Sequence, residues 1–503
     1  KAGLDVCVVE KQDKVGGGVI TREVTLPGFK HDLGSTIHAH MMANPLISND
    51  ELGLKSKYGL SYIKTQGPQM AMLFPDGEAI ILYPNIDKTC ECIEKFSKRD
   101  AEAYPKFCQA TASILEAVNI AAYSPPPSLG TLISFLEASE EGREYLRVIL
   151  SSPLDIAEEW FESEQMKMLI CGMAGTMIVW PWEKGTGVYV CGLSHIHKVG
   201  ASIPQGGAGA LSEALEECIK DNGGTIMTLN QVNKVKVDEG KAKGVILNNG
   251  DEIKAKNAVV SCVNVKQLFL DMLSSEELPP SFQEKVGRIK HSAFAGMRMH
   301  IAVKESAKYI IGGDLNETLF VNIYPSSLEK FLRIFEGYAH GIPSSRMPSL
   351  SSLTLADPTR APKGKHTFGI HHHEPYSLRN SGSGNWDEMK QNITNDFLKT
   401  VRMHTINMGD DNILDKWISS PLDYERENPA MICGDTHHIG SSLSQSFGNR
   451  PIPGWHHYKT PIKKLYMCGA STYPTGGVSG SGRIAVQIIM EDLGLDFRKV
   501  VAK

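Results

Sequence analysis

Short apolar runs lie near both ends of the chain, and each precedes a glycine-rich turn. Residues 4–9 come before three glycines at 16–18, and residues 465–468 come before a turn that continues to residue 480. Short continuous apolar runs of this kind predict buried strands of a parallel sheet. The two ends of the chain therefore have the same predicted character.

The segment from about residue 200 to residue 265 has a similar pattern. Leu211, Leu215 and Ile219 recur at every fourth position and predict a helix over about 208–220, which the glycine pair at 223–224 ends. Strands are expected at 226–229, 232–237 and 258–263. The segment "GVILNNGDEI", residues 244–253, is predicted to be a further hairpin with its Asn-Gly pair at the turn.

The remaining segments have a different character. The Asp-Gly pair at 76–77 predicts a hairpin, helical patterns dominate to about residue 190, and residues 291–430 suggest a sheet with covering helices. We predict an α/β fold in which a Rossmann-like domain is discontinuous, over 1–65, 200–290 and 430–503. An α+β substrate domain, 66–199 and 291–429, would be inserted into it.

Composition narrows the class of protein. The 503 residues include 52 Lys and Arg and 57 Asp and Glu, a net charge of −5, which provides no basic footprint for nucleic acid. The ten cysteines form no CxxC pair, and those at 7, 262 and 468 lie in apolar runs, which predicts small core residues in a reducing compartment. No apolar stretch is long enough to span a bilayer, so we expect a cytoplasmic protein, with peripheral membrane contact left open.

Glu10 gives the first indication of chemistry. In a dinucleotide-binding βαβ unit, an acid at the end of the second strand accepts hydrogen bonds from a ribose, about 20 residues after a glycine-rich phosphate turn. No such turn precedes Glu10 in these residues. We expect an N-terminally incomplete record of a longer protein, and the alternative is a shortened protein that has lost its cofactor.

The last segment provides a second candidate cofactor contact. Its glycine-rich turn leads into a predicted helix that carries Ile484 and Ile488 on its inner side. The free N–H groups and positive dipole end of such a helix suit a phosphate or a reduced flavin ring. A simple helix cap is the alternative explanation, because glycine-rich turns are common.

Together these pieces resemble the phytoene-desaturase-like branch of the FAD-dependent amine oxidase superfamily. The resemblance covers nearly the whole chain and includes "GFKHDLGSTIH", "FSKRDAEAYPKF" and "RPIPGWHHYKTPIKKLYMCGAST". It implies a glutathione-reductase-like FAD domain. The residues that it places at the cofactor are Glu10 at the ribose, Gly16, Gly17 and Gly18 at the backbone approach, Arg22 near the flavin, Val232 at the adenine, Gly469 and Ala470 at the pyrophosphate and ribityl chain, and Gly477, Val478 and Ser479 at the pyrimidine edge.

Catalytic residues are harder to recognise. His38 and His40 follow the "DLGSTIH" turn, and Tyr473 would line the substrate side of the ring, so these three are the candidates. The other histidines, at 195, 197, 371–373, 437–438 and 456–457, are more simply explained as polar loop or interface residues. No HExxH motif or carboxylate–histidine set indicates a metal.

We predict that the protein desaturates an apolar, alicyclic or polyene small molecule by hydride transfer to flavin N5. The electron acceptor and the oligomeric state stay unassigned. Three alternatives remain: an amine oxidase that releases hydrogen peroxide, a non-redox polyene isomerase, and a cofactor-free binding protein. Bound flavin, peroxide release and net acceptor consumption distinguish them.

Overall fold

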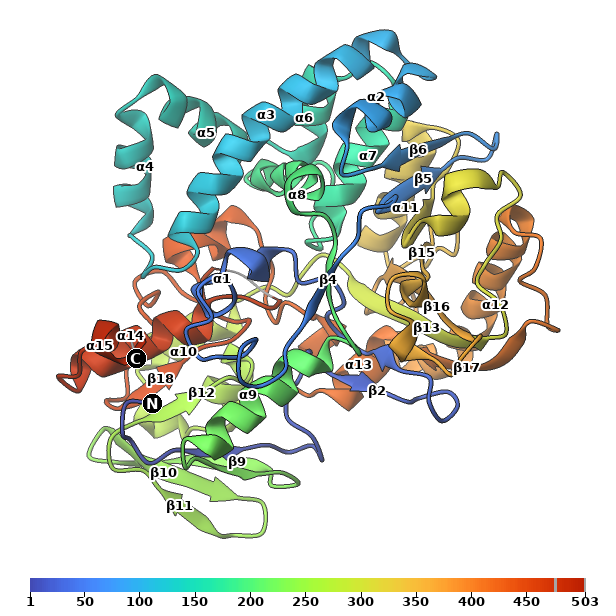
Figure 1. The fold of residues 1–503 in the computed structure, drawn as a ribbon. Helices are drawn as coiled ribbons and strands as arrows, with labels where there is room; N and C mark the ends of the chain where they lie inside the picture. Colours follow the sequence, from blue (N-terminus) through green and yellow to red (C-terminus); the bar gives the residue numbers. More distant parts are fainter. Residues whose placement is uncertain (475–476, 502–503) are drawn as a thin grey trace.

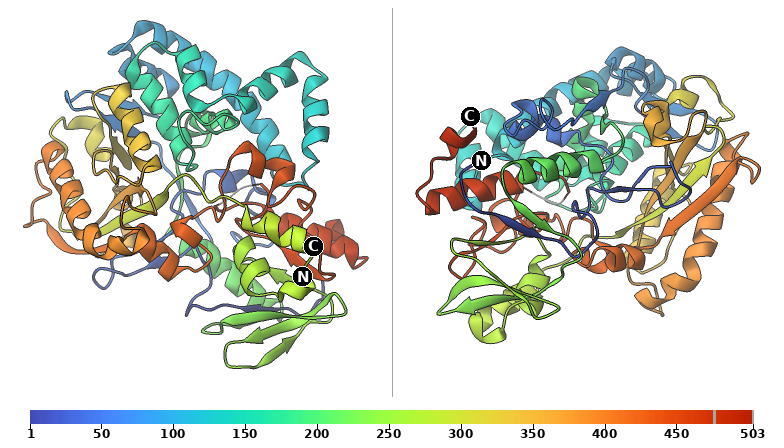
Figure 2. Two further views of the ribbon diagram at one scale, coloured as in Figure 1. Left: turned by 180° about the vertical axis from the view of Figure 1, so that it is seen from behind. Right: turned by 60° about the horizontal axis from the view of Figure 1, so that its bottom comes forward.

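The computed structural model describes residues 1–474 and 477–501, without the side chain of His40. Figure 1 shows three regions: helices at the top, a large sheet at the right, and a smaller α/β region at the lower left that holds both termini. In the two views of Figure 2, the N-terminus again lies beside the C-terminal helices. These are α14 (Ser481–Asp492) and α15 (Phe497–Val501).

The α/β region is built from the predicted strands and helices. β1 (Cys7–Val9) pairs in parallel with β8 (Thr225–Met227), and β12 (Val259–Ser261) pairs in parallel with β18 (Leu465–Met467). The helix predicted over 208–220 is α9 (Gly209–Asp221). The predicted hairpin is confirmed as part of a three-stranded antiparallel sheet of β9 (Val232–Asp238), β10 (Lys241–Leu247) and β11 (Glu252–Lys254).

The two parallel ladders of this region are separate two-stranded sheets. Both ladders border the same cavity. Val6, directly before β1, is 46% exposed, and Val260, within β12, is 44% exposed. The prediction that the cysteines at 7 and 262 are core residues is therefore wrong. Both are exposed because they lie at these open strand edges, whereas Cys468 is buried.

A seven-stranded sheet forms the second region, in the order β17-β13-β16-β15-β14-β5-β6. One face packs against α12 (Trp386–His404), through Trp386, Phe397 and Val401. The strands are β5 (Met70–Leu73), β6 (Ala79–Leu82), β13 (Ala295–Val303), β14 (Phe320–Ile323), β15 (Ser349–Ser351), β16 (His366–Glu374) and β17 (Ile413–Ser419).

Alternation along β13 decides what lies on each face of this sheet. Met297, Met299 and Ile301 point into the core beneath α12. Because successive strand residues point to opposite faces, Arg298 and His300 lie on the other side. That side borders the cavity described below.

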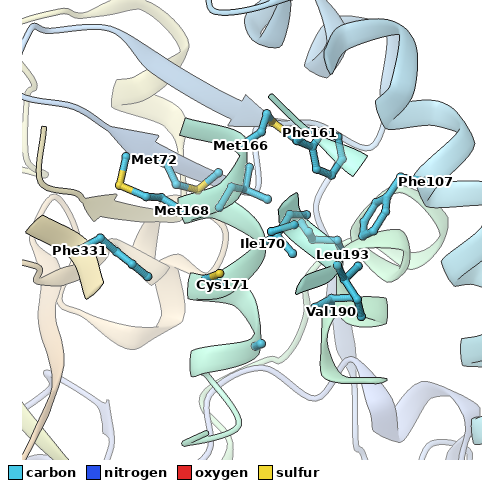
Figure 3. Close-up of a cluster of buried hydrophobic side chains, with 14 of the residues drawn as sticks. Met72, Phe107, Phe161, Met166, Met168, Ile170, Cys171, Val190, Leu193 and Phe331 are labelled. Atoms are coloured by element: carbon cyan, nitrogen blue, oxygen red, sulfur yellow. The ribbon is translucent and has the colours of Figure 1, made fainter. Parts of the chain in front are cut away.

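The helical region has its own apolar core, which Figure 3 shows. Met166, Met168 and Ile170 of α7 are fully buried there beside Phe107 of α3 and Leu193 of α8. The helices are α2 (Ile86–Glu94), α3 (Lys98–Ala121), α4 (Leu129–Glu137), α5 (Glu140–Leu150), α6 (Pro153–Trp160), α7 (Glu164–Gly175) and α8 (Gly192–Val199), with α11 (Leu328–Ala339) against α7.

Short elements connect the three regions. The predicted domain boundaries near residues 65, 200, 290 and 430 remain predictions. No helix among the described residues is long and apolar enough to cross a bilayer. The connecting elements are β2 (Thr21–Arg22), β3 (His31–Asp32), α1 (Pro45–Ser48), β4 (Tyr62–Lys64), β7 (Ser202–Pro204), α10 (Pro280–Gly287) and α13 (Pro421–Glu427).

Candidate functional site

A cavity of about 2410 Å³ connects the glycine turns with the free face of the seven-stranded sheet. Glu10, Gly17 and Gly469 lie along one part of its wall, and Arg298 and His371 lie along another. Single-ligand pockets usually measure about 300–1,000 Å³. The cavity therefore has room for a large cofactor and a second molecule beside it.

Glu10 stands at the end of β1, as predicted. Its backbone N–H donates to Met227 O (2.9 Å), and its Oε1 accepts from the Gln12 N–H (2.8 Å). Within the described residues no cation forms an ion pair with this carboxylate, which lines the cavity. Its second oxygen can therefore accept a hydrogen bond from a ligand hydroxyl.

The first glycine turn depends on the absence of side chains. Gly16 has φ +126°, and a Cβ there would lie 2.5 Å from Val19 O. A Cβ on Gly34 would lie 1.9 Å from Gly18 O, so the segment behind the turn also has to be glycine. The backbone of residues 16–18 can therefore come close to a bound molecule.

Arg22 lines the cavity but is already paired. Its Nη1 donates to Asp13 Oδ2 (3.0 Å), and its Nη2 forms a second short bond to the same carboxylate. The predicted positive charge near the flavin is therefore largely neutralised by Asp13. Val232, the predicted adenine contact, begins β9 and also borders the cavity.

The second glycine turn is held by polar contacts. Gly469 has φ +86° and donates its N–H to Ser481 Oγ (3.0 Å) at the start of α14. Ala470 O accepts from Arg450 (2.5 Å). Gly477, Val478 and Ser479 line the cavity directly before α14, where the helix N-terminus was predicted to meet the cofactor.

The three catalytic candidates have different surroundings. His38 lines the cavity and is buried; its Nδ1 shares a hydrogen bond with Tyr62 Oη (3.0 Å), and its Nε2 has no partner among the described residues. Tyr473 borders the cavity and packs in an apolar cluster with Tyr458. The His40 side chain lies outside the described residues. The roles of all three stay predictions.

Comparison with known proteins assigns this arrangement to a family. The family described as flavin containing amine oxidoreductase matches residues 1–297, more than half of the chain. The chain belongs to this family.

Several relatives match almost the whole length of the chain. It is 28% identical to pyridine nucleotide-disulfide oxidoreductase domain-containing protein 2 of Rattus norvegicus, over 98% of this chain and 90% of that protein. It is 25% identical to a limonene dehydrogenase component of Castellaniella defragrans, over 99% and 92%, and 25% identical to the neurosporene-forming phytoene desaturase of Rhodobacter capsulatus, over 97% and 90%. The chain is an FAD-dependent oxidoreductase of the phytoene-desaturase-like branch.

Solved structures support the predicted fold. An oxidoreductase from Methanosarcina mazei has a TM-score of 0.52 at 17% identity, over 97% of this chain and 95% of that chain. A protein of Pyrococcus furiosus has a TM-score of 0.54 at 15% identity, over 99% and 94%. The discontinuous Rossmann-like α/β architecture is therefore confirmed.

The described residues fit FAD. Glu10, a carboxylate with a free oxygen, follows β1, and two turns that contain glycines line a cavity large enough for the cofactor. The predicted contacts Glu10, Gly16, Gly469 and Gly477 all border that cavity. FAD supplies the hydride acceptor when bound, and these residues would hold it.

A polar cluster on the free sheet face was missed by the sequence reasoning. Arg298 and His371 are directly opposite in the β13–β16 pairing, and Arg298 Nε donates to His371 Nδ1 (3.2 Å). The rings of His371 and His373 are 5.0 Å apart. The sequence did contain a signal for this cluster, because polar residues occupy alternate positions in both strands. Alternate residues of a strand point to the same face of the sheet.

The Glu10 role can be tested by a single substitution. Glu10→Ala should weaken FAD binding about tenfold, because the ribose would lose a charge-assisted hydrogen bond. Quenching of flavin fluorescence during titration measures the dissociation constant. Glu252→Ala, a surface acid on β11 that pairs with Lys236, should change it less than twofold. Equal constants for Glu10→Ala and the unaltered protein would exclude the ribose contact.

Buried histidines predict a pH dependence of stability. Burial lowers the pKa of His31, His38, His372 and His438 to about 4. In the unfolded chain a histidine has a pKa of about 6.5, so between these values the unfolded state binds more protons. The free energy of unfolding should therefore fall as pH decreases from about 6.5 to about 4.

Thermal unfolding at several pH values measures this effect. Tm should fall between about pH 7 and about pH 5. His31→Gln should flatten the fall, because one of the neutral imidazoles is removed, while the exposed His340→Gln should leave it unchanged. A Tm that stays constant over this range would contradict the conclusion that these histidines are buried and neutral in the folded protein.

Proposed function

We propose that the protein is an FAD-dependent dehydrogenase that desaturates a substrate with an apolar body. The observation that supports it most directly is the continuity of one cavity from the glycine turns to the sheet. The helical side of this cavity is apolar, through Leu115 and Val118 of α3, Met173 of α7, and Met177 and Val188 nearby. Such a wall excludes water and aligns an apolar substrate beside the flavin.

The loop after α13 connects the cofactor turn with the substrate side. Gln12 Nε2 donates to Glu427 O (2.8 Å), and a Cβ on Gly18 would lie 3.1 Å from Met431 Cε. The last residue of α13 and the loop that follows it therefore lie against the segment of the first glycine turn. Substrate carbons held between this loop and the sheet would be close to the flavin, which favours a direct hydride transfer.

The chain's own contribution to the chemistry is mainly positioning. Burial lowers the pKa of His38 to about 4, so this imidazole is neutral at pH 7 and accepts a proton weakly. Glu427 lines the cavity near Arg298, and burial raises its pKa to about 7, which suits a proton acceptor at neutral pH. If the substrate loses a proton beside a carbonyl, Glu427 is the better-matched base.

An anaerobic reduction experiment tests the proposal. FAD-loaded protein is mixed with cyclic terpenes, polyenes and acyl compounds, and bleaching of the oxidised flavin band is followed. Bleaching with formation of an alkene product supports a dehydrogenase. Hydrogen peroxide and an aldehyde from amines would instead support an amine oxidase, and product isomers formed only with pre-reduced flavin would support an isomerase.

A further inference from the structure

The cavity wall contains a guanidinium without a carboxylate partner. Arg298 is partly exposed on the free face of β13; its Nη1 donates to the backbone oxygen of Asp32 (2.9 Å), and its Nε donates to His371. Among the described residues no Asp or Glu forms an ion pair with it. A partly buried guanidinium without a carboxylate partner is available to an anion that enters the cavity.

Two imidazoles lie beside this guanidinium, and a third, that of His437, borders the same cavity. His371 lies opposite Arg298 and His373 lies opposite Gly296 in the same strand pairing. His373 has no hydrogen-bond partner among the described residues, and its ring packs 4.9 Å from Phe294. His437 also borders the cavity, and its Nδ1 is buried with no hydrogen-bond partner in the part of the chain that the structure describes. Because His371 Nδ1 accepts from Arg298, the neutral His371 ring carries its proton on Nε2, where it can donate to a ligand.

Gly296 leaves room in front of the cluster. A Cβ at this position would lie 3.3 Å from Tyr424 Cζ and 3.6 Å from His371 Cε1. Any side chain would crowd the space between these rings. The glycine keeps the cavity open where Arg298, His371 and His373 converge.

The surrounding acids do not neutralise the cluster. The carboxylate of Asp32 is occupied by Arg360 (2.6 Å), and Asp435 accepts from the backbone of Ser292 and of His437. The positive charge of Arg298 lowers the pKa of Glu427, but burial raises it more. The resulting pKa of about 7 leaves Glu427 partly protonated at neutral pH. Burial holds the pKa of His371 well below its usual range and that of His373 at about 3, so both are neutral donors.

We propose that Arg298, His371, His373 and His437 bind the carboxylate of the substrate, whose apolar body lies along the helical wall. This inference rests on the proposed function, because it places the carboxylate in the cavity that would hold the reacting carbons. A planar guanidinium matches a carboxylate with two parallel hydrogen bonds. Among the described residues no group of three His, Cys, Asp or Glu side chains is arranged to hold a metal, so the imidazoles are available as donors.

Binding of decanoate and decan-1-ol to the FAD-loaded protein tests the proposal. Calorimetry measures both dissociation constants, and perturbation of the flavin absorption shows that each probe lies near the cofactor. Decanoate should bind at least about tenfold more tightly than the alcohol. Equal affinities, or no binding of decanoate, would overturn the proposal.

Three variants separate charge recognition from folding. Arg298→Gln should weaken decanoate about 30-fold or more and leave decan-1-ol within about twofold. His373→Leu keeps an apolar contact with Phe294 and removes only the ring nitrogens, so it should weaken decanoate about fivefold in a fully folded protein. Arg333→Gln, on the surface of α11, is the matched control.

Reduction of the flavin distinguishes this proposal from the proposed function. If decanoate is preferred and depends on Arg298, but no substrate bleaches the flavin, the carboxylate site stands and the dehydrogenase activity fails. If neutral hydrocarbons bleach the flavin and Arg298→Gln behaves like Arg333→Gln, the activity stands and the carboxylate site is overturned.

Discussion

Replacing Arg450 by methionine should lower the free energy of unfolding by about 4 kcal/mol or more and weaken FAD binding at least about tenfold. The guanidinium of Arg450 is completely buried and donates to six backbone oxygens, at 2.5–3.3 Å. Those acceptors are His437, Ile439, Gly440, Gln445, Ala470 and Thr472. Methionine fills similar space but donates nothing, so these oxygens would stay buried without their donor.

The expected loss of FAD affinity follows from the positions of the six acceptor oxygens, which belong to two different loops. Four belong to the loop that carries His437, and two belong to the turn that begins at Gly469. Arg450 therefore fixes the predicted pyrophosphate turn against the histidine loop. Burial lowers the pKa of Arg450 to about 10, which still leaves it charged at pH 7.

Chemical denaturation and flavin titration measure the two effects separately. Arg450→Lys keeps one charge but reaches fewer acceptors, so its stability should fall between that of the unaltered protein and that of Arg450→Met. Arg288→Met, at the exposed residue that directly follows α10, is the control. If folded Arg450→Met bound FAD with unchanged affinity, Arg450 would stabilise the fold without positioning the cofactor turn.

Local patterns in the sequence were sufficient for the α/β region. The helix predicted over 208–220 begins and ends one residue later in the structure, because the spacing of Leu211, Leu215 and Ile219 and the following glycines are local signals. The Asn-Gly hairpin is confirmed for the same reason. Exposure of the cysteines at 7 and 262 could not be predicted, because it depends on which strands pair.

On the substrate side, local sequence patterns were not sufficient to predict which residues meet. Arg298 and His371 are 73 positions apart in the chain and meet only through the β13–β16 pairing. Nothing near either residue in the sequence specifies that partner, and a run of three histidines resembles any polar strand or loop. Arg450 lies in a segment that carries the family resemblance, but its six acceptors come from two loops whose contact is also long-range.

The second large effect is expected at Arg360, the centre of a buried ion-pair network. Its Nη1 donates to Asp32 Oδ2 (2.6 Å) and its Nε donates to Asp357 Oδ2 (3.1 Å), and all three side chains are almost completely buried. Arg360→Met should lower the free energy of unfolding by about 3–5 kcal/mol, because two carboxylates would remain buried without their cation. Urea unfolding monitored by far-UV circular dichroism measures it.

The same network positions the wall beside the first glycine turn. Asp32 Oδ1 accepts from Ala208 N (2.8 Å), and Asp357 Oδ2 accepts from Gly206 N (2.7 Å). These residues lead into α9, whose Ser212 lies against Gly16; a Cβ on Gly16 would approach Ser212 Oγ to 2.8 Å. Loss of Arg360 should therefore also weaken FAD binding, although Arg360 does not border the cavity.

The loss of stability in Arg360→Met can come from unpaired buried charge or from lost packing, and a combined variant distinguishes the two. Arg360→Met with Asp32→Asn and Asp357→Asn removes the guanidinium and both negative charges, while the amide oxygens can still accept from Ala208 and Gly206. This triple variant should be more stable than Arg360→Met alone, because an uncompensated buried charge costs more than a neutral replacement. If the triple variant were as unstable as the single one, the packing and hydrogen bonds of Arg360 to Pro204 O would account for the loss, and the charge argument would fail.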